Sequence, residues 1–327
     1  MGIKIIATGR YVPERVLTNA DLEKMVETSD EWIRTRTGIE TRHIADASQA
    51  TSDMCREAAK KALEMAGIAP SELGAIVVAT ITPDHSFPNT ACLLQEEIGA
   101  KNAFCFDLSA ACSGLIYSLV TAQALMKMTP NLKYVLVLGA EKLSSIVDWE
   151  DRNTCVLFGD GAAAVILEKT DDGNDSIKAY NLGADGACKD ILFMPAGGSR
   201  MPASLESVQN RKHFINMTGK EVFKFAVNAM VSSSQQAMTD AGVAPDDIKF
   251  LVPHQANYRI LKAVAQRLDI PEERVYMNLN RYGNTSAASI GLCLDEMVRN
   301  NLLQKGDKVL LTAFGGGLTW GSIVLEW

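Results

Sequence analysis

The sequence lacks several features that would place it in a special class of protein. It has no apolar run approaching the roughly 20 residues of a membrane-spanning helix. Its first residues, MGIK, provide too little apolar length for a signal peptide. None of the seven cysteines has C-x-x-C spacing and their number is odd, which argues against a zinc site or a disulfide framework. We therefore expect a cytoplasmic protein with reduced thiols, without a metal site and without membrane contact.

The charge balance excludes another class of function. Asp and Glu number 39 against 32 Lys and Arg, which gives a net charge of -7. A chain this acidic is not expected to bind nucleic acid over a broad face, although a local basic patch could still meet an acidic partner. The length of 327 residues suggests about two domains, and 47% hydrophobic with 22% charged residues is ordinary globular composition.

An internal repeat is the clearest sign of organisation. Residues 62–78 and 237–253 are identical at six of 17 positions, and both predict a helix end, a glycine stop, a proline turn and a buried strand. The similarity continues in the same order, because 135–139 resembles 309–313 and 161–168 resembles 321–326. We therefore predict two similar halves, residues 1–175 and 176–327.

The strand signals indicate the fold class. Residues 75–80, 134–139 and 308–313 are short, continuous apolar runs that alternate with helical segments. Such runs are typical of strands buried on both faces of a mainly parallel sheet. This predicts an α/β protein whose two sheets pack between layers of helices. Residues 170–176 form the polar junction between the halves, and residues 195–211 are expected to be a long surface loop.

Cys112 is the strongest candidate for a nucleophile. An apolar strand runs to Leu108, small residues follow, and Leu115, Leu119 and Ala122 then have helical spacing. Cys112 would therefore lie at a strand-to-helix turn, where the helix dipole and free N–H groups favour a thiolate. The other six cysteines are expected to be buried and inert.

Two further polar residues follow predicted turns. His254 comes directly after the strand 250–252, and active sites in α/β folds collect at the carboxyl ends of strands. Residues 279–289 predict a strand end, a glycine turn and a helix start, which would place Asn284 at a turn resembling that of Cys112. From these residues alone, a hydrogen-bonded core histidine and a turn or N-cap asparagine remain open alternatives.

Two glycine runs need separate interpretations. Residues 159–164 match G-x-G-x-x-A, but apolar residues 165–167 predict a following strand, whereas a dinucleotide-binding fingerprint requires a following helix. We therefore reject a dinucleotide site. The glycines at 315–317 follow a strand and would let backbone N–H groups approach a ligand, with a tight turn as the ordinary alternative. The segment 110–114 differs from a hydrolase nucleophile elbow because Ala110 replaces the first glycine.

Taken together, four motifs resemble the β-ketoacyl-acyl carrier protein synthase III family, which starts bacterial fatty-acid synthesis. They are ACSG at 111–114, VPHQAN at 252–257, GNTS at 283–286 and FGGGLTWG at 314–321. The resemblance begins with GRYVP at 9–13 and TSDEWIRTRTGI at 28–39, so it covers essentially the whole chain. It implies a thiolase fold with a layered α-β-α-β-α core, whose first half carries the cysteine and whose second half carries the histidine and asparagine.

The resemblance also implies a reaction, a decarboxylative Claisen condensation. Cys112 would take the acyl group from an acyl-coenzyme A as a thioester, and His254 and Asn284 would bind the thioester carbonyl of malonyl-acyl carrier protein. They would stabilise the enolate formed as carbon dioxide leaves, and its carbanion would attack the acyl-cysteine. Backbone N–H groups of Cys112 and Gly316 would form the oxyanion hole. The expected products are 3-oxoacyl-acyl carrier protein, carbon dioxide and coenzyme A, with ping-pong kinetics and no metal or redox cofactor.

By the same resemblance, Trp32 would stack on adenine and Phe87 would reach the acyl pocket of the partner in a homodimer. A basic patch would dock the acidic carrier protein, with part of it on one face of the helix after His254. The residues expected at coenzyme A are Thr28, Trp32, Arg36, Arg152, Gly219, Phe223 and Asn257, and those expected at the carrier protein are Lys224, Arg259, Lys262 and Arg267.

Two other functions compete with this interpretation. A related condensing enzyme of secondary metabolism, making alkylquinolones or polyketide starters, would share the fold and the three catalytic residues. A cysteine hydrolase using Cys112 and His254 would need a carboxylate to orient the histidine, and residue 284 is an amide. Acetyl, propionyl and branched primers differ by only about 1–3 kcal/mol of pocket discrimination. We expect the loops around Phe87 and 195–211 to select among them.

Overall fold

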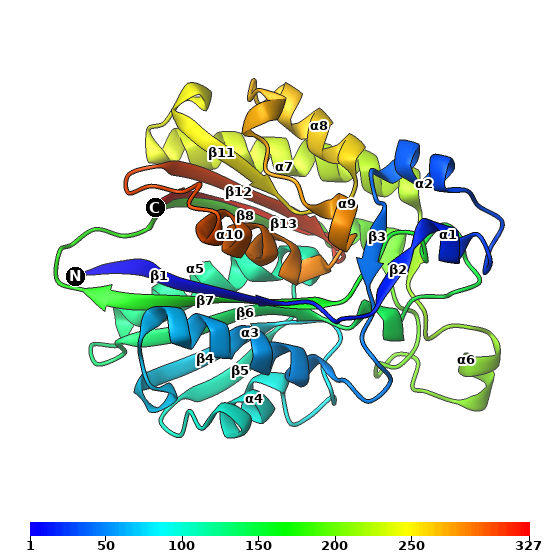
Figure 1. The fold of residues 1–327 in the computed structure, drawn as a ribbon, viewed down its shortest axis with the longest axis horizontal. Helices are drawn as coiled ribbons and strands as arrows, with labels where there is room; N and C mark the ends of the chain where they lie inside the picture. The colour runs from blue at the N-terminus through cyan, green and yellow to red at the C-terminus, as the bar shows by residue number, and fades with distance from the viewer.

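The computed structural model describes all 327 residues as five layers, in which two β-sheets alternate with three layers of helices (Figure 1). The first sheet has five strands in the order β1-β7-β6-β4-β5. Its central strands pair in parallel, as β4 does with both β5 and β6, while β7 runs antiparallel to β6 and to β1. The strands are β1 (Gly2–Tyr11), β4 (Leu73–Ala79), β5 (Phe104–Leu108), β6 (Tyr134–Glu141) and β7 (Gly161–Thr170).

The second sheet has four strands in the order β11-β12-β13-β8 and contains only residues after 176. β11 and β12 are parallel, and β13 runs antiparallel to β12 and β8. Its strands are β8 (Ile177–Ala184), β11 (Ile248–Pro253), β12 (Lys308–Gly315) and β13 (Thr319–Glu326). Two further sheets have two strands each: β2 (Val16–Thr18) pairs with β3 (Thr41–His43), and β9 (Leu192–Phe193) pairs with β10 (Asn216–Met217).

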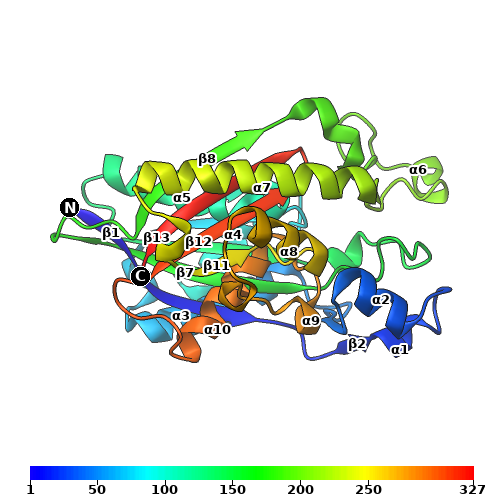
Figure 2. The same cartoon turned by 90° about the horizontal axis from the view of Figure 1, so that it is seen from above.

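Helices fill the space between the two sheets and cover their outer faces, as Figures 1 and 2 show from two directions. α5 and α10 are buried between the sheets, α3 and α4 cover the first sheet, and α7 and α8 cover the second. The helices are α1 (Asn19–Leu22), α2 (Asp30–Thr37), α3 (Thr51–Ala66), α4 (Thr90–Ile98), α5 (Gly114–Met128), α6 (Leu205–Gln209), α7 (Gly219–Ala241), α8 (Tyr258–Arg267), α9 (Leu279–Tyr282) and α10 (Ser289–Arg299).

The repeat found in the sequence is visible in the backbone. α3 ends at Gly67 with φ 66°, and α7 ends at Gly242 with φ 65°, so each helix stops at a glycine in the left-handed conformation. A proline, Pro70 or Pro245, then opens a short 3-10 turn that leads into β4 or β11. The predicted succession of helix, glycine, proline turn and strand is confirmed in both copies.

One expectation about the surface loops is only partly correct. Residues 195–211 contain α6, which the sequence analysis treated as loop; Ser204 caps this helix by accepting a hydrogen bond from the Ser207 backbone N–H. Leu205, at its start, is 84% exposed, so the segment has no apolar face that would have given it a helical pattern. No helix in the structure combines the length and the hydropathy needed to span a membrane.

Candidate active site

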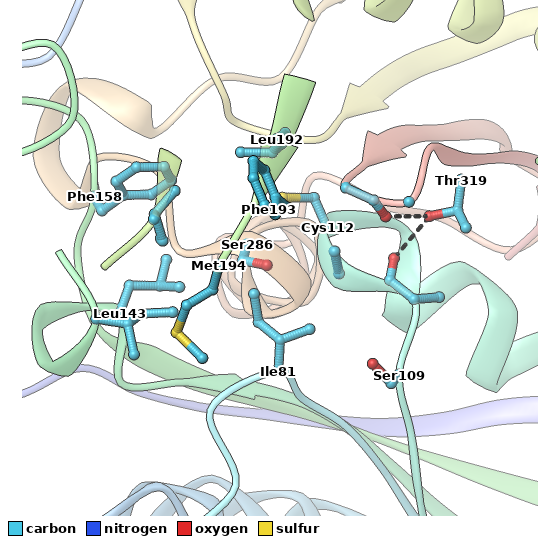
Figure 3. A pocket seen from close by; sticks show the side chains of 16 residues that line it. Ile81, Ser109, Cys112, Leu143, Phe158, Leu192, Phe193, Met194, Ser286 and Thr319 are labelled. Atoms are coloured by element: carbon cyan, nitrogen blue, oxygen red, sulfur yellow. Dashed lines mark hydrogen bonds between the residues drawn. The ribbon is translucent and has the colours of Figure 1, made fainter. Parts of the chain in front are cut away.

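Three neighbouring cavities meet around Cys112. An outer cavity of about 630 Å³ opens at α2, α7 and α8, and it shares Gly219, Phe223 and Asn257 with an inner cavity of about 140 Å³. The inner cavity shares Cys112 and Phe158 with a third, largely apolar cavity of about 400 Å³ (Figure 3). Together they form a path from the surface to the sulfur and a separate apolar space beyond it.

A matched pair of tight turns builds the floor of this site. Cys112 lies in a 3-10 turn, η2 (Ala111–Ser113), between β5 and α5, and the second half has the corresponding turn η7 (Ser286–Ala288) before α10. Ala111 and Ser286, the first residues of the two turns, adopt left-handed φ values of 46° and 48°. Such values are uncommon outside glycine and gather at functional sites. The predicted strand-to-helix turn at Cys112 is confirmed.

The surroundings of Cys112 do not favour a thiolate as the sequence predicted. Burial raises the pKa of the Cys112 thiol to about 12, and hydrogen bonding with Ser286 opposes that rise only in part. The carboxylate of Glu141 adds to the increase. The position at a helix start was the basis for expecting a thiolate, but loss of hydration of the charged sulfur outweighs it. At neutral pH the resting side chain is a thiol and must give up its proton to react.

His254 follows β11 directly, as predicted, and lines the inner cavity together with Cys112. It is 3% exposed, and this burial lowers the pKa of its imidazole to about 3, so the ring is neutral at physiological pH. Its Nδ1 lies 2.7 Å from Ser289 Oγ at the start of α10. When Ser289 donates to Nδ1, the ring proton is on Nε2, which is then a hydrogen-bond donor.

Asn284 lines the same inner cavity, but it is held differently from the prediction. Residues 279–282 form the short helix α9 rather than a strand end, and Gly283 with φ 65° then turns the chain. The backbone N–H of Asn284 donates to the Leu157 carbonyl at 2.8 Å. Its side-chain Oδ1 accepts from the Ser286 backbone N–H at 2.9 Å, which leaves the amide Nδ2 as the available donor.

The glycine-rich hairpin between β12 and β13 passes directly over the Cys112 turn. A Cβ atom on Gly315 would lie 2.7 Å from the backbone N of Cys112, so only glycine allows this approach. Thr319 fixes the hairpin by donating to the Ala110 carbonyl at 3.0 Å (Figure 3). The Thr319 hydroxyl also lies 2.7 Å from Ser113 Oγ. Gly316 therefore lines the same cavity as Cys112, where the oxyanion hole was expected.

The mouth of the outer cavity contains most of the residues expected at coenzyme A. Its lining includes Trp32, Arg36, Gly219, Phe223 and Asn257. Asn257 also caps α8, because Oδ1 accepts from the Arg259 backbone N–H at 2.9 Å, and its Nδ2 donates to the Arg36 carbonyl at 3.1 Å. Thus α2 and α8 are tied together at the entrance.

Other expected contacts lie beside this mouth or away from it. Arg152 does not line the cavity; its guanidinium stacks over the Trp32 ring at 5.1 Å and donates to the Glu27 carbonyl at 2.8 Å. Thr28 is also outside the lining, and its hydroxyl is buried without a partner. Phe87 lies in the segment between β4 and α4 with 84% of its surface exposed, and it lines none of the three cavities that meet around Cys112.

The four residues expected at the carrier protein lie on α7 and α8. Lys224 and Arg259 are exposed, and Arg259 also lines the mouth of the outer cavity. Lys262 is 3.4 Å from the carboxylate of Glu272, and Arg267 donates to Asn228 Oδ1 at 2.6 Å. The structure therefore leaves Lys224 and Arg259 as the cations of this group without a side-chain partner.

Three residues that line or support the site were not predicted from the sequence. Lys220 adds a cation to the mouth of the outer cavity. Ser286 lines the apolar cavity beside Cys112, and Glu141 is buried behind it at the end of β6. Ser286 belongs to the GNTS motif and could have been named from it. Glu141 ends an apolar strand and carries no local signal.

Comparison with known proteins identifies the family. The family model for 3-oxoacyl-[acyl-carrier-protein (ACP)] synthase III matches residues 106–186, and the model for its C-terminal part matches residues 238–327. The β-ketoacyl-[acyl-carrier-protein] synthase III of Caldanaerobacter subterraneus subsp. tengcongensis is 55% identical over 323 residues, covering 99% of this chain and 97% of that protein. The chain belongs to the β-ketoacyl-[acyl-carrier-protein] synthase III family. It is a condensing enzyme, an acyltransferase that starts fatty-acid synthesis.

Solved structures of synthase III enzymes support the same assignment. The enzyme from Aquifex aeolicus is 47% identical, with a TM-score of 0.91 and full coverage of both chains. A priming β-ketosynthase from a polyketide biosynthetic pathway superposes equally well, with a TM-score of 0.91 and coverage of 99% and 96%, but is only 33% identical. The thiolase fold is therefore shown, and the fatty-acid function is favoured over the secondary-metabolic alternative.

Proposed function

We propose that this synthase III condenses an acyl-coenzyme A primer with malonyl-acyl carrier protein through an acyl group on Cys112. The observation that carries the proposal is the meeting of two cavities at this sulfur. One leads to a mouth with Arg36, Lys220 and Arg259, whose charges suit the phosphates of coenzyme A. The other is an apolar space of about 400 Å³, which suits the acyl chain of the primer.

His254 and Asn284 are proposed to act in the second half-reaction. Both line the inner cavity, and each can present an N–H donor there, since Ser289 occupies Nδ1 of the imidazole and Ser286 occupies Oδ1 of the amide. A neutral donor pair can hold the malonyl thioester oxygen while charge develops on it as carbon dioxide leaves. The electron pair of the broken C–C bond then forms the new bond to the acyl carbon on Cys112, and the sulfur leaves.

The oxyanion formed at the acyl carbon is assigned to the backbone N–H groups of Cys112 and Gly316. The close approach of the β12–β13 hairpin to the Cys112 turn supports this placement. These steps need no metal or redox cofactor. We further propose a cytoplasmic homodimer in which Phe87 contributes to the partner's acyl cavity, and two structural halves divided near residue 175.

The decisive experiment maps the acyl group. After incubation with acetyl-coenzyme A and no malonyl donor, mass spectrometry should find one acetyl group on the peptide containing Cys112. Cys112→Ser should lose the adduct, because a serine hydroxyl ionises far less readily than a thiol. Cys188→Ser is the matched control, since Cys188 is also partly exposed but lines none of the three cavities. An adduct on another residue, or its persistence in Cys112→Ser, would contradict the assignment.

A further inference from the structure

Glu141 is a buried carboxyl that the proposed mechanism leaves without a role. It is the last residue of β6 and is 0% exposed. None of the ion pairs of the structure includes it. A carboxyl without a cation is costly to bury in its charged form, so hydrogen bonds must hold it. Those hydrogen bonds show which of its two oxygens can carry a proton.

One oxygen of Glu141 is fully committed as an acceptor. Oε2 accepts from the Thr80 hydroxyl at 3.2 Å, the Ile81 backbone N–H at 3.1 Å and the Thr82 hydroxyl at 2.8 Å. Each threonine oxygen also accepts a backbone N–H, from Thr82 and Lys142 respectively, which directs its own proton to Glu141. Three donors at Oε2 exclude a proton there, so a proton on this carboxyl must be on Oε1.

Oε1 faces the hydroxyl of Ser286 at 3.1 Å. Ser286 and Cys112 line the same apolar cavity (Figure 3), and the Ser286 hydroxyl lowers the pKa of the Cys112 thiol. Ser286 is held in place by its left-handed backbone and by the bond from its N–H to Asn284 Oδ1. A serine hydroxyl has one proton and can both donate and accept. It can therefore donate to Glu141 while it accepts from the thiol, or donate to the sulfur while it accepts from Glu141.

We propose that Glu141 receives the proton of Cys112 through Ser286 when the thiol becomes a nucleophile. This inference rests on the proposed function, in which Cys112 is acylated. As the sulfur attacks the thioester carbon, its proton passes to Ser286 Oγ and the hydroxyl proton of Ser286 passes to Glu141 Oε1. The Cys112 S–C bond forms and the C–S bond to coenzyme A breaks. The departing thiolate takes up one proton, which the relay returns in the reverse direction, so charge and atoms balance.

The transfer runs uphill, because burial raises the pKa of the Cys112 thiol to about 12 but that of Glu141 only to about 7, so the proton leaves the thiol only as the sulfur bonds to the thioester carbon. Burial raises the pKa of Glu141 to about 7, so the carboxylate is available as an acceptor above that pH and is already protonated below it. His254, with a pKa lowered to about 3 by burial, stays neutral over the same range and adds no titration step. The direction of the pH dependence follows from this: the relay works above about pH 7, where Glu141 is a carboxylate, and fails below it, where Glu141 is protonated.

The charged and titratable surroundings of Glu141 do not change that sign. Burial raises the pKa of Cys55 on α3 well above its usual range, so this neighbour stays neutral. Lys142, next in sequence, uses its ammonium to donate to the Asp46 and Gln49 carbonyls. Asp160, beside β7, accepts from Ser144 and from the Ala45 backbone.

The test measures how the reactivity of Cys112 depends on pH, using neutral iodoacetamide as the probe and mass spectrometry to follow the Cys112 peptide. In the wild type the rate should rise about tenfold per pH unit up to about pH 7. It should then level off over about one to two units, because proton transfer within a coupled pair does not depend on pH. In Glu141→Gln the carboxyl is absent, so the rate should continue to rise about tenfold per unit through this range, as for an isolated thiol.

Ser286→Ala interrupts the relay at its middle and should give the same continuous rise, which keeps the test available if Glu141→Gln does not fold. Asp160→Asn is the matched control, since it removes another buried carboxyl that has no contact with Ser286, and it should keep the wild-type levelling. A levelling near pH 7 that survives in Glu141→Gln or Ser286→Ala overturns the relay. Failure of the proposed function looks different: acetyl-coenzyme A would then leave Cys112 unmodified in the wild type itself.

Discussion

Asn284 allows the donor role of a side chain to be separated from its structural role. Its Oδ1 supports the Ser286 turn by accepting the Ser286 backbone N–H at 2.9 Å. Its Nδ2 has no hydrogen-bond partner within the protein, and Asn284 lines the inner cavity, so Nδ2 is the donor available there. Asn284→Ala removes both groups. Asn284→Asp keeps an oxygen for Ser286 but replaces the donor with a second acceptor. The two substitutions should therefore agree in condensation and differ in their effect on the turn.

The expected loss follows from the role of one donor. Removing a single oxyanion donor costs on the order of 10²–10³ in rate, or about 2.7–4 kcal/mol. We expect carbon dioxide release from malonyl-acyl carrier protein to fall by at least this factor in Asn284→Ala. In Asn284→Asp the loss should be equal or larger, because the added negative charge opposes the developing enolate. Acetylation of Cys112 should stay within about threefold of wild type in Asn284→Asp, since the Ser286 turn is intact.

The assay follows the two half-reactions separately. Acetylation is timed by intact-protein mass spectrometry without a malonyl donor, and decarboxylation is followed with enzyme that has been acetylated beforehand. Normal carbon dioxide release by Asn284→Asp would refute the assignment of Nδ2 as a donor to the malonyl oxygen. An equal loss in both half-reactions would show instead that Asn284 acts only by shaping the turn.

Three further outcomes are expected. Lys224→Glu should raise KM for malonyl-acyl carrier protein several-fold, and its difference from wild type should shrink in high salt. Acetylation should be unchanged because Lys224 lines none of the cavities, and a changed acetylation rate would contradict this. Trp32→Ala should raise KM for acetyl-coenzyme A by about threefold to tenfold, as expected for loss of one aromatic contact, and Trp32→Phe should recover part of it. Gly139→Ala should lower the free energy of unfolding by about 1–3 kcal/mol in a denaturant titration, because the new Cβ would lie 2.2 Å from the Ala287 carbonyl oxygen; unchanged stability would show that the turn can move away.

The sequence was sufficient to predict the positions of Cys112 and His254. His254 directly follows β11, and Cys112 follows β5 after residues 109–111. A change from strand to helix periodicity is a local signal in the sequence. The repeat gave the layered architecture for the same reason, since glycine stops and proline turns leave identifiable residues in each copy. Asn284 was predicted at the correct turn but with a strand before it. Val275 forms a single parallel bridge with Leu251, but no strand develops after it, and the chain enters α9 at Leu279.

What the sequence could not predict depends on contacts between distant segments. The raised pKa of Cys112 results from burial by both halves of the fold, which overrides the local effect of a helix start. Glu141 and Ser286 are 145 positions apart, and no spacing rule relates them. The partners of Lys262 and Arg267 likewise come from other segments, because they are Glu272 and a residue of α7. Helix periodicity placed these cations on one face, but it could not show that each already has a side-chain partner.

The two matched turns determine how many acyl groups one chain can carry. Both halves form the same strained elbow, but the position corresponding to Cys112 in the second half is Ala287, whose side chain is 1% exposed and whose carbonyl is packed against Gly139. The second turn therefore presents no nucleophile, and its residues Ser286 and Asn284 line the cavities at Cys112 instead. Under the proposed function, one chain would therefore carry one acyl equivalent, on Cys112, and the reaction centre would need residues from both turns.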